Sequence, residues 1–153
     1  MENPPGRGNE PAAGPLLEQS YKIEGGNFIA AGNAATRLKD LLKEIKIPAD
    51  IIRRAAICSF EAEMNVVMYA RRGLMKLDVF PTEIVLQVDD EGPGIPDIEM
   101  AMQEGYSTAT EFMREYGFGA GMGLPNMKKN SNRFEIHSVI GKGTHLRISI
   151  SLK

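Results

Sequence analysis

The chain has 153 residues, the size of a single domain, of which 42% are hydrophobic and 25% are charged. With a formal net charge of −2, it shows neither the basic surface of a nucleic-acid-binding protein nor a charge that favours a membrane. Cys58 is the only cysteine, which excludes an intramolecular disulfide. The two histidines, His137 and His145, do not complete a zinc site with it at any usual spacing.

Residues 1–16 are rich in proline, glycine, asparagine and glutamate, so we expect a flexible tail followed by one domain over residues 17–153. No apolar run approaches the roughly 18 residues that a membrane span needs. The N-terminus also lacks the apolar stretch of a signal peptide. We therefore expect a cytoplasmic protein that contacts neither membrane nor nucleic acid.

Apolar residues recur at helical spacing in two segments, and Pro48 fits the first turn of the second one. Alternating apolar residues such as Ile84, Leu86 and Val88 indicate strands. The expected elements are, in chain order, a strand at 20–24, helices at about 30–45 and 48–71, strands at 74–80 and 83–89, a helix that begins near 124, and a terminal hairpin of 134–139 and 144–152. Strands in one layer and helices in another predict a two-layer α/β sandwich.

The first candidate functional motif is a polar pair in the second expected helix. Glu61 and Asn65 are one turn apart and share a face. Their neighbours Ile57, Met64 and Met68 are apolar, and we expect them to be buried. Burying a polar group without a partner beside them costs about 1–3 kcal/mol of free energy, so the pair needs an explanation. One explanation is a hydrated Mg²⁺, with Asn65 as a ligand and Glu61 holding a water or acting as base. Ordinary polar residues at the edge of a domain also explain the pair.

The second motif, Asp90 to Ile95 (DEGPGI), directly follows a strand. Glycines such as Gly92 and Gly94 let the backbone approach a ligand closely. A carboxylate at the end of a strand can accept a hydrogen bond from an exocyclic amine such as that of adenine. A plain turn would use the same residue types.

The third motif, Gly117 to Leu124 (GFGAGMGL), precedes an expected helix and has glycine at alternate positions. A mobile glycine loop that leads into a helix can cradle phosphates, and a flexible linker is the other interpretation. The spacing matches neither the dinucleotide-binding fingerprint nor the P-loop. The fourth motif, Gly141 to Thr144 (GKGT), reads on its own as a hairpin turn.

In this order and spacing, the four motifs resemble the N, G1, G2 and G3 boxes of the GHKL ATPase superfamily, over roughly Tyr21 to Leu152. The resemblance implies the ATPase fold of that superfamily, with a mixed, mostly antiparallel sheet and helices on one face. It also implies that Asn65 binds Mg²⁺, that Glu61 is the catalytic base, and that Asp90 recognises the adenine amine with support from Thr144. The other implied nucleotide-binding residues are Gly92, Gly94, Ile95, Gly117, Gly119, Gly121, Met122, Gly123 and Leu124.

Within the superfamily, the small chain without a histidine before His137 resembles the bacterial anti-sigma factors and serine protein kinases of the SpoIIAB, RsbW and RsbT kind. The segments from Glu61 to Gly73 and from Asp90 to Glu99 look closer to the RsbT branch. The resemblance implies an ATP- and Mg²⁺-dependent kinase that phosphorylates a serine on a STAS-domain antagonist. The implied partners are such an antagonist, a sigma factor or a phosphatase, and a homodimer is compatible with it. A nucleotide-gated module that switches a partner by contact, with little or no kinase activity, would use the same residues.

Overall fold

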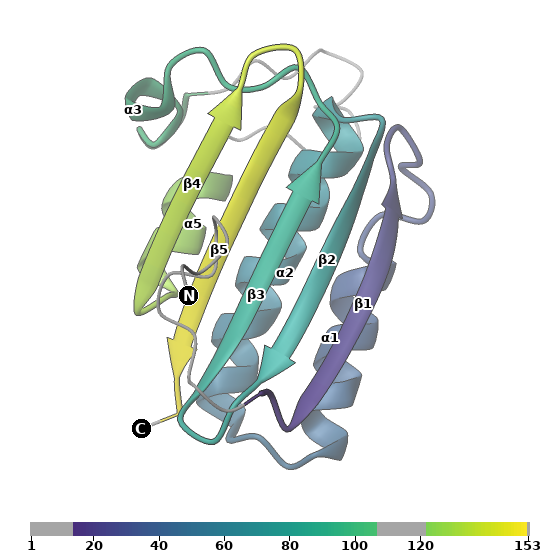
Figure 1. Ribbon diagram of the computed structural model, residues 1–153, viewed down its shortest axis with the longest axis vertical. Coiled ribbons are helices and arrows are strands. Elements are labelled where there is room, and N and C mark those ends of the chain that lie inside the picture. The colour runs from purple at the N-terminus through teal and green to yellow at the C-terminus, as the bar shows by residue number, and fades with distance from the viewer. Residues whose placement is uncertain (1–13, 107–121, 153) are drawn as a thin grey trace.

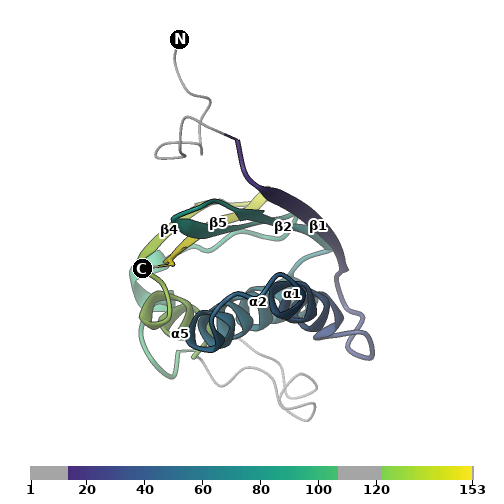
Figure 2. The same cartoon turned by 90° about the horizontal axis from the view of Figure 1, so that it is seen from below.

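The computed structural model describes residues 14–106 and 122–152, in which one sheet is covered on one face by helices (Figure 1). Figure 2 shows the two layers, with α1, α2 and α5 on the same side of the sheet. The strands are β1 (Leu17–Glu24), β2 (Arg72–Val79), β3 (Glu83–Asp90), β4 (Arg133–Val139) and β5 (Gly143–Ser151). The helices are α1 (Asn33–Glu44), α2 (Ala49–Tyr69), α3 (Ile98–Ala101) and α5 (Gly123–Lys129). The predicted two-layer α/β sandwich is confirmed.

The strands lie in the order β1-β2-β3-β5-β4, and every neighbouring pair in the described part of the chain is antiparallel. Because β3 pairs with β5, the end of β3 lies beside the start of β5, with Asp89 opposite His145. This pairing brings the second and fourth sequence motifs to the same end of the two adjacent strands, although they are about fifty positions apart in the chain.

Several element boundaries differ from the sequence predictions by one to three residues, and three of these differences have a clear local reason. Strand β1 begins at Leu17, earlier than predicted, because it pairs with β2 along its whole length. Helix α1 begins at Asn33 because Gly32 before it has the positive φ of 97°. Helix α2 ends at Tyr69 because Ala70 is already extended, with φ −105° and ψ 162°.

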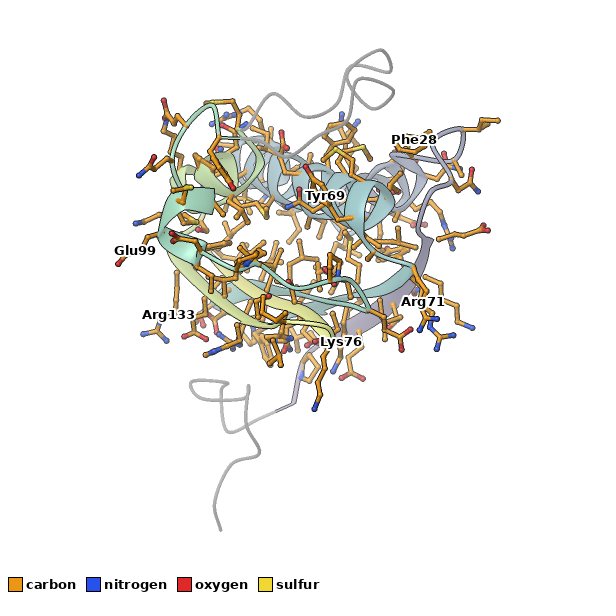
Figure 3. All side chains as sticks on the ribbon, turned by 90° about the horizontal axis from the view of Figure 1, so that it is seen from above. Phe28, Tyr69, Arg71, Lys76, Glu99 and Arg133 are labelled. Atoms are coloured by element: carbon orange, nitrogen blue, oxygen red, sulfur yellow. The ribbon has the colours of Figure 1, made fainter. Side chains whose placement is uncertain are left out.

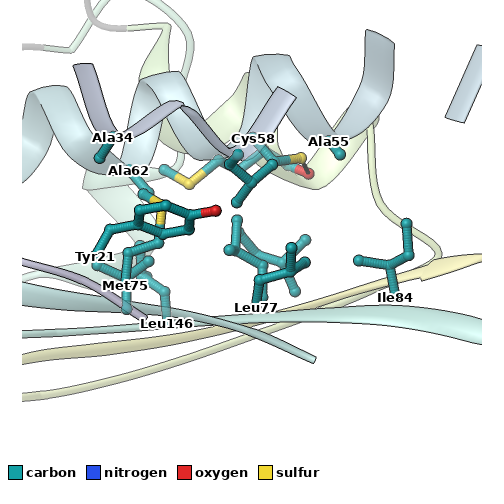
Figure 4. Packing of buried hydrophobic residues seen from close by; sticks show 14 of the residues in the cluster. Tyr21, Ala34, Ala55, Cys58, Ala62, Met75, Leu77, Ile84 and Leu146 are labelled. Atoms are coloured by element: carbon teal, nitrogen blue, oxygen red, sulfur yellow. Dashed lines mark hydrogen bonds between the residues drawn. The ribbon is translucent and has the colours of Figure 1, made fainter. Parts of the chain in front are cut away.

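The hydrophobic core fills the space between the helical layer and the sheet (Figure 4). Small side chains on the helices, including Ala55, Cys58 and Ala62, face larger ones on the strands, such as Met75 and Leu77. The small residues let α2 lie close to the sheet. This close packing fixes the position of α2 relative to the end of β3.

The opposite face of the sheet carries polar side chains. Lys76 and Arg133 point away from the helices in Figure 3. Among the described residues, no helix is long and apolar enough to cross a membrane.

Candidate functional site

Asp90 lies at the end of β3 and is held there by two backbone groups. Its Oδ1 accepts hydrogen bonds from the N–H groups of Gly92 at 3.0 Å and Thr144 at 3.1 Å. Its Oδ2 accepts none from the described part of the chain. Burial raises the pKa of Asp90 above its ordinary value, the N–H groups of Thr144 and Gly92 lower it, and the neighbouring Asp89 raises it further. The side chain therefore has one fixed oxygen and one that is available to a hydrogen-bond donor.

The turn before β5 closes tightly over Asp90. Gly143 has a φ of 144°, and a Cβ built on it would lie 1.9 Å from the carbonyl oxygen of Asp90. Ser138 connects this turn to the loop after β3, because its Oγ accepts a hydrogen bond from Ile95 N at 2.7 Å and lies 2.9 Å from Thr144 Oγ1. The fourth motif is thus more than a hairpin turn, since it fixes the Asp90 carboxylate.

Close approach also explains the glycines of the second motif. A Cβ on Gly94, which has a φ of 81°, would lie 2.6 Å from the carbonyl oxygen of Val139. A Cβ on Gly92 would lie 3.0 Å from Asp90 Oδ1 and 3.3 Å from the Cβ of Ala70. The loop after β3 is therefore packed against both the β4–β5 turn and the end of α2.

Glu61 and Asn65 share a half-buried face of α2, as the spacing predicted, and α5 covers this face. A Cβ on Gly123 would lie 3.2 Å from Glu61 Oε2 and 3.5 Å from Asn65 Oδ1. The amide of Asn126 donates a hydrogen bond to Glu61 Oε1 at 3.3 Å. The side chain of Asn65 forms no hydrogen bond with the described residues, which leaves its oxygen available as a ligand.

The two halves of the site meet where α2 ends. Arg71 N donates a hydrogen bond to the carbonyl oxygen of Glu91 at 3.1 Å, and Glu91 N donates to that of Arg72 at 2.9 Å. These bonds hold the end of α2 beside the loop that follows Asp90 (Figure 1). Asn65 lies about one helical turn before that end.

The remaining predicted residues differ in how deeply they are buried, and some lie outside the part of the chain that the structure describes. Leu124 is only 8% exposed and packs in the core, while Met122 is half-buried immediately before α5. Of the apolar neighbours expected to be buried, Met64 is buried, whereas Ile57 and Met68 are half-buried. The glycines Gly117, Gly119 and Gly121 of the third motif lie outside the described residues.

A hollow of about 620 Å³ lies at the end of α2. Gly92 is part of its wall, together with Phe28, Tyr69, Arg71 and Lys142. Asp90, Asn65 and Thr144 do not line it. This hollow therefore adjoins the residues predicted to bind the nucleotide and shares Gly92 with them.

Four residues with a structural part in this region were not among the predicted site residues. Ser138 and Asn126 support Thr144 and Glu61, and Gly143 provides the close approach to Asp90. Glu63 is 3% exposed, and its carboxylate accepts hydrogen bonds from the N–H groups at the start of α1. The unusual glycine spacing of the fourth motif was a usable signal for Gly143. The contacts of Asn126 and Glu63, and the hydrogen bond of Ser138 with Ile95, arise from pairings between distant parts of the chain.

The sequence matches the family described as histidine kinase-, DNA gyrase B-, and HSP90-like ATPases over residues 52–153. The chain belongs to this family. The matched region contains all four motifs and every predicted site residue, and the family is one of ATPases, in agreement with the predicted superfamily.

Individual relatives show which members of this family the chain is similar to. The chain is 32% identical over 140 residues to an anti-sigma F factor of Clostridium kluyveri, which covers 86% of this chain and 93% of that protein. It is 32% identical over 91 residues to the serine/threonine-protein kinase RsbT of Bacillus subtilis, and this match covers 57% of this chain and 62% of RsbT. An anti-sigma F factor of Caldanaerobacter subterraneus is 35% identical over 94 residues, with 58% and 62% covered. The matches to the last two proteins thus span about three fifths of their lengths. The predicted kinship with anti-sigma factors and regulatory serine kinases is confirmed.

Proposed function

We propose that this chain binds Mg²⁺-ATP and transfers the γ-phosphoryl group to a serine of a regulatory partner protein in a partner-switching system. The observation that carries the proposal is the joint arrangement of Asp90, Asn65 and Glu61 around the end of α2. One oxygen of Asp90 and the amide of Asn65 have no hydrogen-bond partner among the described residues, and Glu61 lies one helical turn from Asn65. The relatives named as a serine/threonine-protein kinase and as anti-sigma F factors support the same function.

Asp90 would recognise the adenine base. The N–H groups of Gly92 and Thr144 hold Oδ1, so Oδ2 is oriented to accept a hydrogen bond from the exocyclic amine. The hydrogen bond between Thr144 and Ser138 keeps the hydroxyl of Thr144 in place beside Asp90. A carboxylate that is already oriented loses little further entropy when it binds the base.

Asn65 fits the role of a magnesium ligand. Mg²⁺ takes oxygen ligands, keeps several waters and is usually bound through one or two protein groups together with substrate phosphates. Among the described residues, no group of three or more His, Cys, Asp or Glu side chains could hold a metal ion by itself. A single protein ligand, the amide oxygen of Asn65, completed by waters and phosphate oxygens, agrees with this preference of Mg²⁺. When bound, Mg²⁺ would neutralise charge on the phosphates.

Glu61 would act as the general base. Asn126 holds Oε1, while Oε2 lies on the side of Gly123. Glu61 would take the proton from the serine hydroxyl while the serine oxygen forms a bond to the γ-phosphorus. The bond between the γ-phosphorus and the oxygen that bridges it to the β-phosphate breaks, which releases ADP. Phosphoryl transfer depends mainly on positioning and charge neutralisation, so one base beside one metal ligand is sufficient. The backbone N–H groups of Gly121 and Gly123 would contact the phosphates, and Gly117 and Gly119 would belong to the loop that covers them.

We propose a STAS-domain antagonist as the partner that carries the serine. The test is transfer of labelled γ-phosphate to such a protein by the wild type and by Glu61→Ala. The variant should retain ATP binding and lose transfer, because a base contributes about 10²–10⁴-fold to such a step. Undiminished transfer by Glu61→Ala would disprove the assignment of the base. Nucleotide-dependent complex formation without any transfer by the wild type would disprove kinase activity and favour a binding module.

A further inference from the structure

A second hollow, of about 690 Å³, lies between α1 and α2 and ends at Glu61. We define it as the α1–α2 groove, lined by Lys39, Lys43, Arg53, Ile57, Phe60 and Glu61 among others. Among the described residues, its wall contains three cations, and the one carboxylate among them is the proposed catalytic base. From this geometry we propose that the groove binds an acidic segment of the partner protein next to the serine that is phosphorylated. This inference rests on the function proposed above.

The charge of the groove determines the kind of segment it fits. Lys39 and Lys43 are exposed and one turn apart on α1, and Arg53 is exposed across from them on α2. None of the three forms an ion pair with the described residues. Three unpaired cations around one groove attract a segment that carries carboxylates and repel one that carries lysines.

The groove also offers apolar contact. Phe60 is 43% exposed, which is unusual for a large aromatic side chain, and it lies in the groove wall with half-buried Ile57. An apolar side chain of the partner would cover this ring. Such aromatic contacts contribute strongly to affinity at protein interfaces, while the surrounding charges determine which partner is accepted.

Continuity with the proposed active site gives the position of the serine. Arg53, Ile57 and Glu61 lie on one side of α2, and the eight positions from Arg53 to Glu61 span about 12 Å along the helix. A serine whose hydroxyl reaches Glu61 would therefore have an acidic residue about three or four positions away in an extended segment. The groove thus specifies both the charge and the spacing of the sequence around the serine.

The test uses two short synthetic peptides, each with a serine, a leucine and glutamates three and four positions from the serine, on its N-terminal side in one and on its C-terminal side in the other. The matched control peptides contain lysine in place of glutamate. Binding to the full chain with Mg²⁺-ATP is measured by fluorescence anisotropy. One glutamate peptide should bind at least about tenfold more tightly than its lysine control. The difference should shrink when NaCl is raised from about 0.05 to 0.5 M, because salt screens exposed charges.

Charge reversal in the groove provides the decisive comparison. Lys39→Glu/Lys43→Glu should weaken binding of the glutamate peptide by about tenfold or more. The control Lys22→Glu/Lys128→Glu makes the same change of charge on exposed residues elsewhere and should alter binding less than about twofold. Phe60→Ala should weaken binding at both salt concentrations, because its contribution is apolar. Equal binding by the groove variant and the control variant would overturn the proposal, as would failure of both glutamate peptides to bind the wild type.

Nucleotide binding, measured on the same variants by thermal shift, separates this inference from the proposed function. The groove variants should keep the full shift with Mg²⁺-ATP, since Lys39 and Lys43 lie outside the nucleotide site. A normal shift without selective peptide binding would reject the groove alone. Selective peptide binding by a wild type that shows no thermal shift with Mg²⁺-ATP would reject the proposed function and support the groove alone. If sedimentation shows that Lys39→Glu/Lys43→Glu separates a dimer while the wild type binds no peptide, the groove is instead a contact between two copies of this chain.

Discussion

Replacing Glu63 by alanine should destabilise the fold, because this buried carboxylate caps a helix that begins some thirty residues earlier in the chain. Its Oε2 accepts hydrogen bonds from Gly32 N at 3.0 Å and Ala34 N at 3.2 Å, and its Oε1 accepts one from Ala35 N at 2.8 Å. Gly32 has no side chain with which to cap α1. Glu63 therefore caps the start of α1 in place of the serine or aspartate that usually occupies the N-cap position.

The size of the loss follows from the groups that alanine would leave unsatisfied. Ala34 and Ala35 are each 6% exposed, so water cannot replace the lost acceptor for their N–H groups. At about 1–3 kcal/mol for each buried, unsatisfied group, Glu63→Ala should lower the free energy of unfolding by about 3 kcal/mol. Glu63→Gln retains one acceptor oxygen and should lose about half as much.

Urea unfolding, followed by far-ultraviolet circular dichroism, measures these changes. Glu44→Ala is the matched control, because Glu44 is an exposed glutamate at the other end of α1, and its loss should stay within about 0.5 kcal/mol. If Glu63→Ala costs no more than this control, the capping role of Glu63 is refuted.

Three further predictions concern the turn beside Asp90, a histidine pair and the buried thiol. Gly143→Ala should cost at least about 2 kcal/mol in urea unfolding because of the overlap with the Asp90 backbone, whereas Gly141→Ala, with no atom within 4 Å, should cost only the strain of its positive φ, about 1 kcal/mol. Hydrogen bonding to Asp89 raises the pKa of His145, so the stability that His145→Asn removes should be fully present below the ordinary histidine pKa of about 6.5 and be lost as the pH rises through the raised pKa; a loss that does not change with pH would contradict the pairing. Burial raises the pKa of Cys58 to about 12, so a thiol reagent at about pH 8 should modify it only after unfolding, and rapid modification of the folded protein would contradict its burial.

The features that could be predicted from the sequence are those encoded locally. Helical spacing and alternation located the elements apart from the short helix α3, and the pair Glu61 and Asn65 on one face of α2 followed from the helical period alone. The contacts that complete the site could not be predicted in this way. Ser138 reaches Ile95 across 43 positions, and Asn126 reaches Glu61 across 65. Such partners are defined by the packing of α5 against α2 and by the pairing of β3 with β5.

Helix ends illustrate the same limit. The start of α1 has no local capping side chain, because its cap comes from Glu63 on the neighbouring helix. The end of α2 depends on Ala70, which becomes extended so that β2 can begin and the loop after Asp90 can pack against it. Neither boundary is determined by the propensity of the residues at that position alone.

Binding of Mg²⁺-ATP, measured by thermal shift, tests the central claim most directly. Asp90→Asn is compared with Asp89→Asn, which changes the neighbouring carboxylate on the opposite face of the strand. With ATP at about 100 times its Kd, the wild type should gain about 2.7 kcal/mol, which raises the Tm of a domain of this size by about 5–10 °C. The account predicts this shift for the wild type and Asp89→Asn, and its loss in Asp90→Asn. A full shift in Asp90→Asn, or none in the wild type, would contradict it.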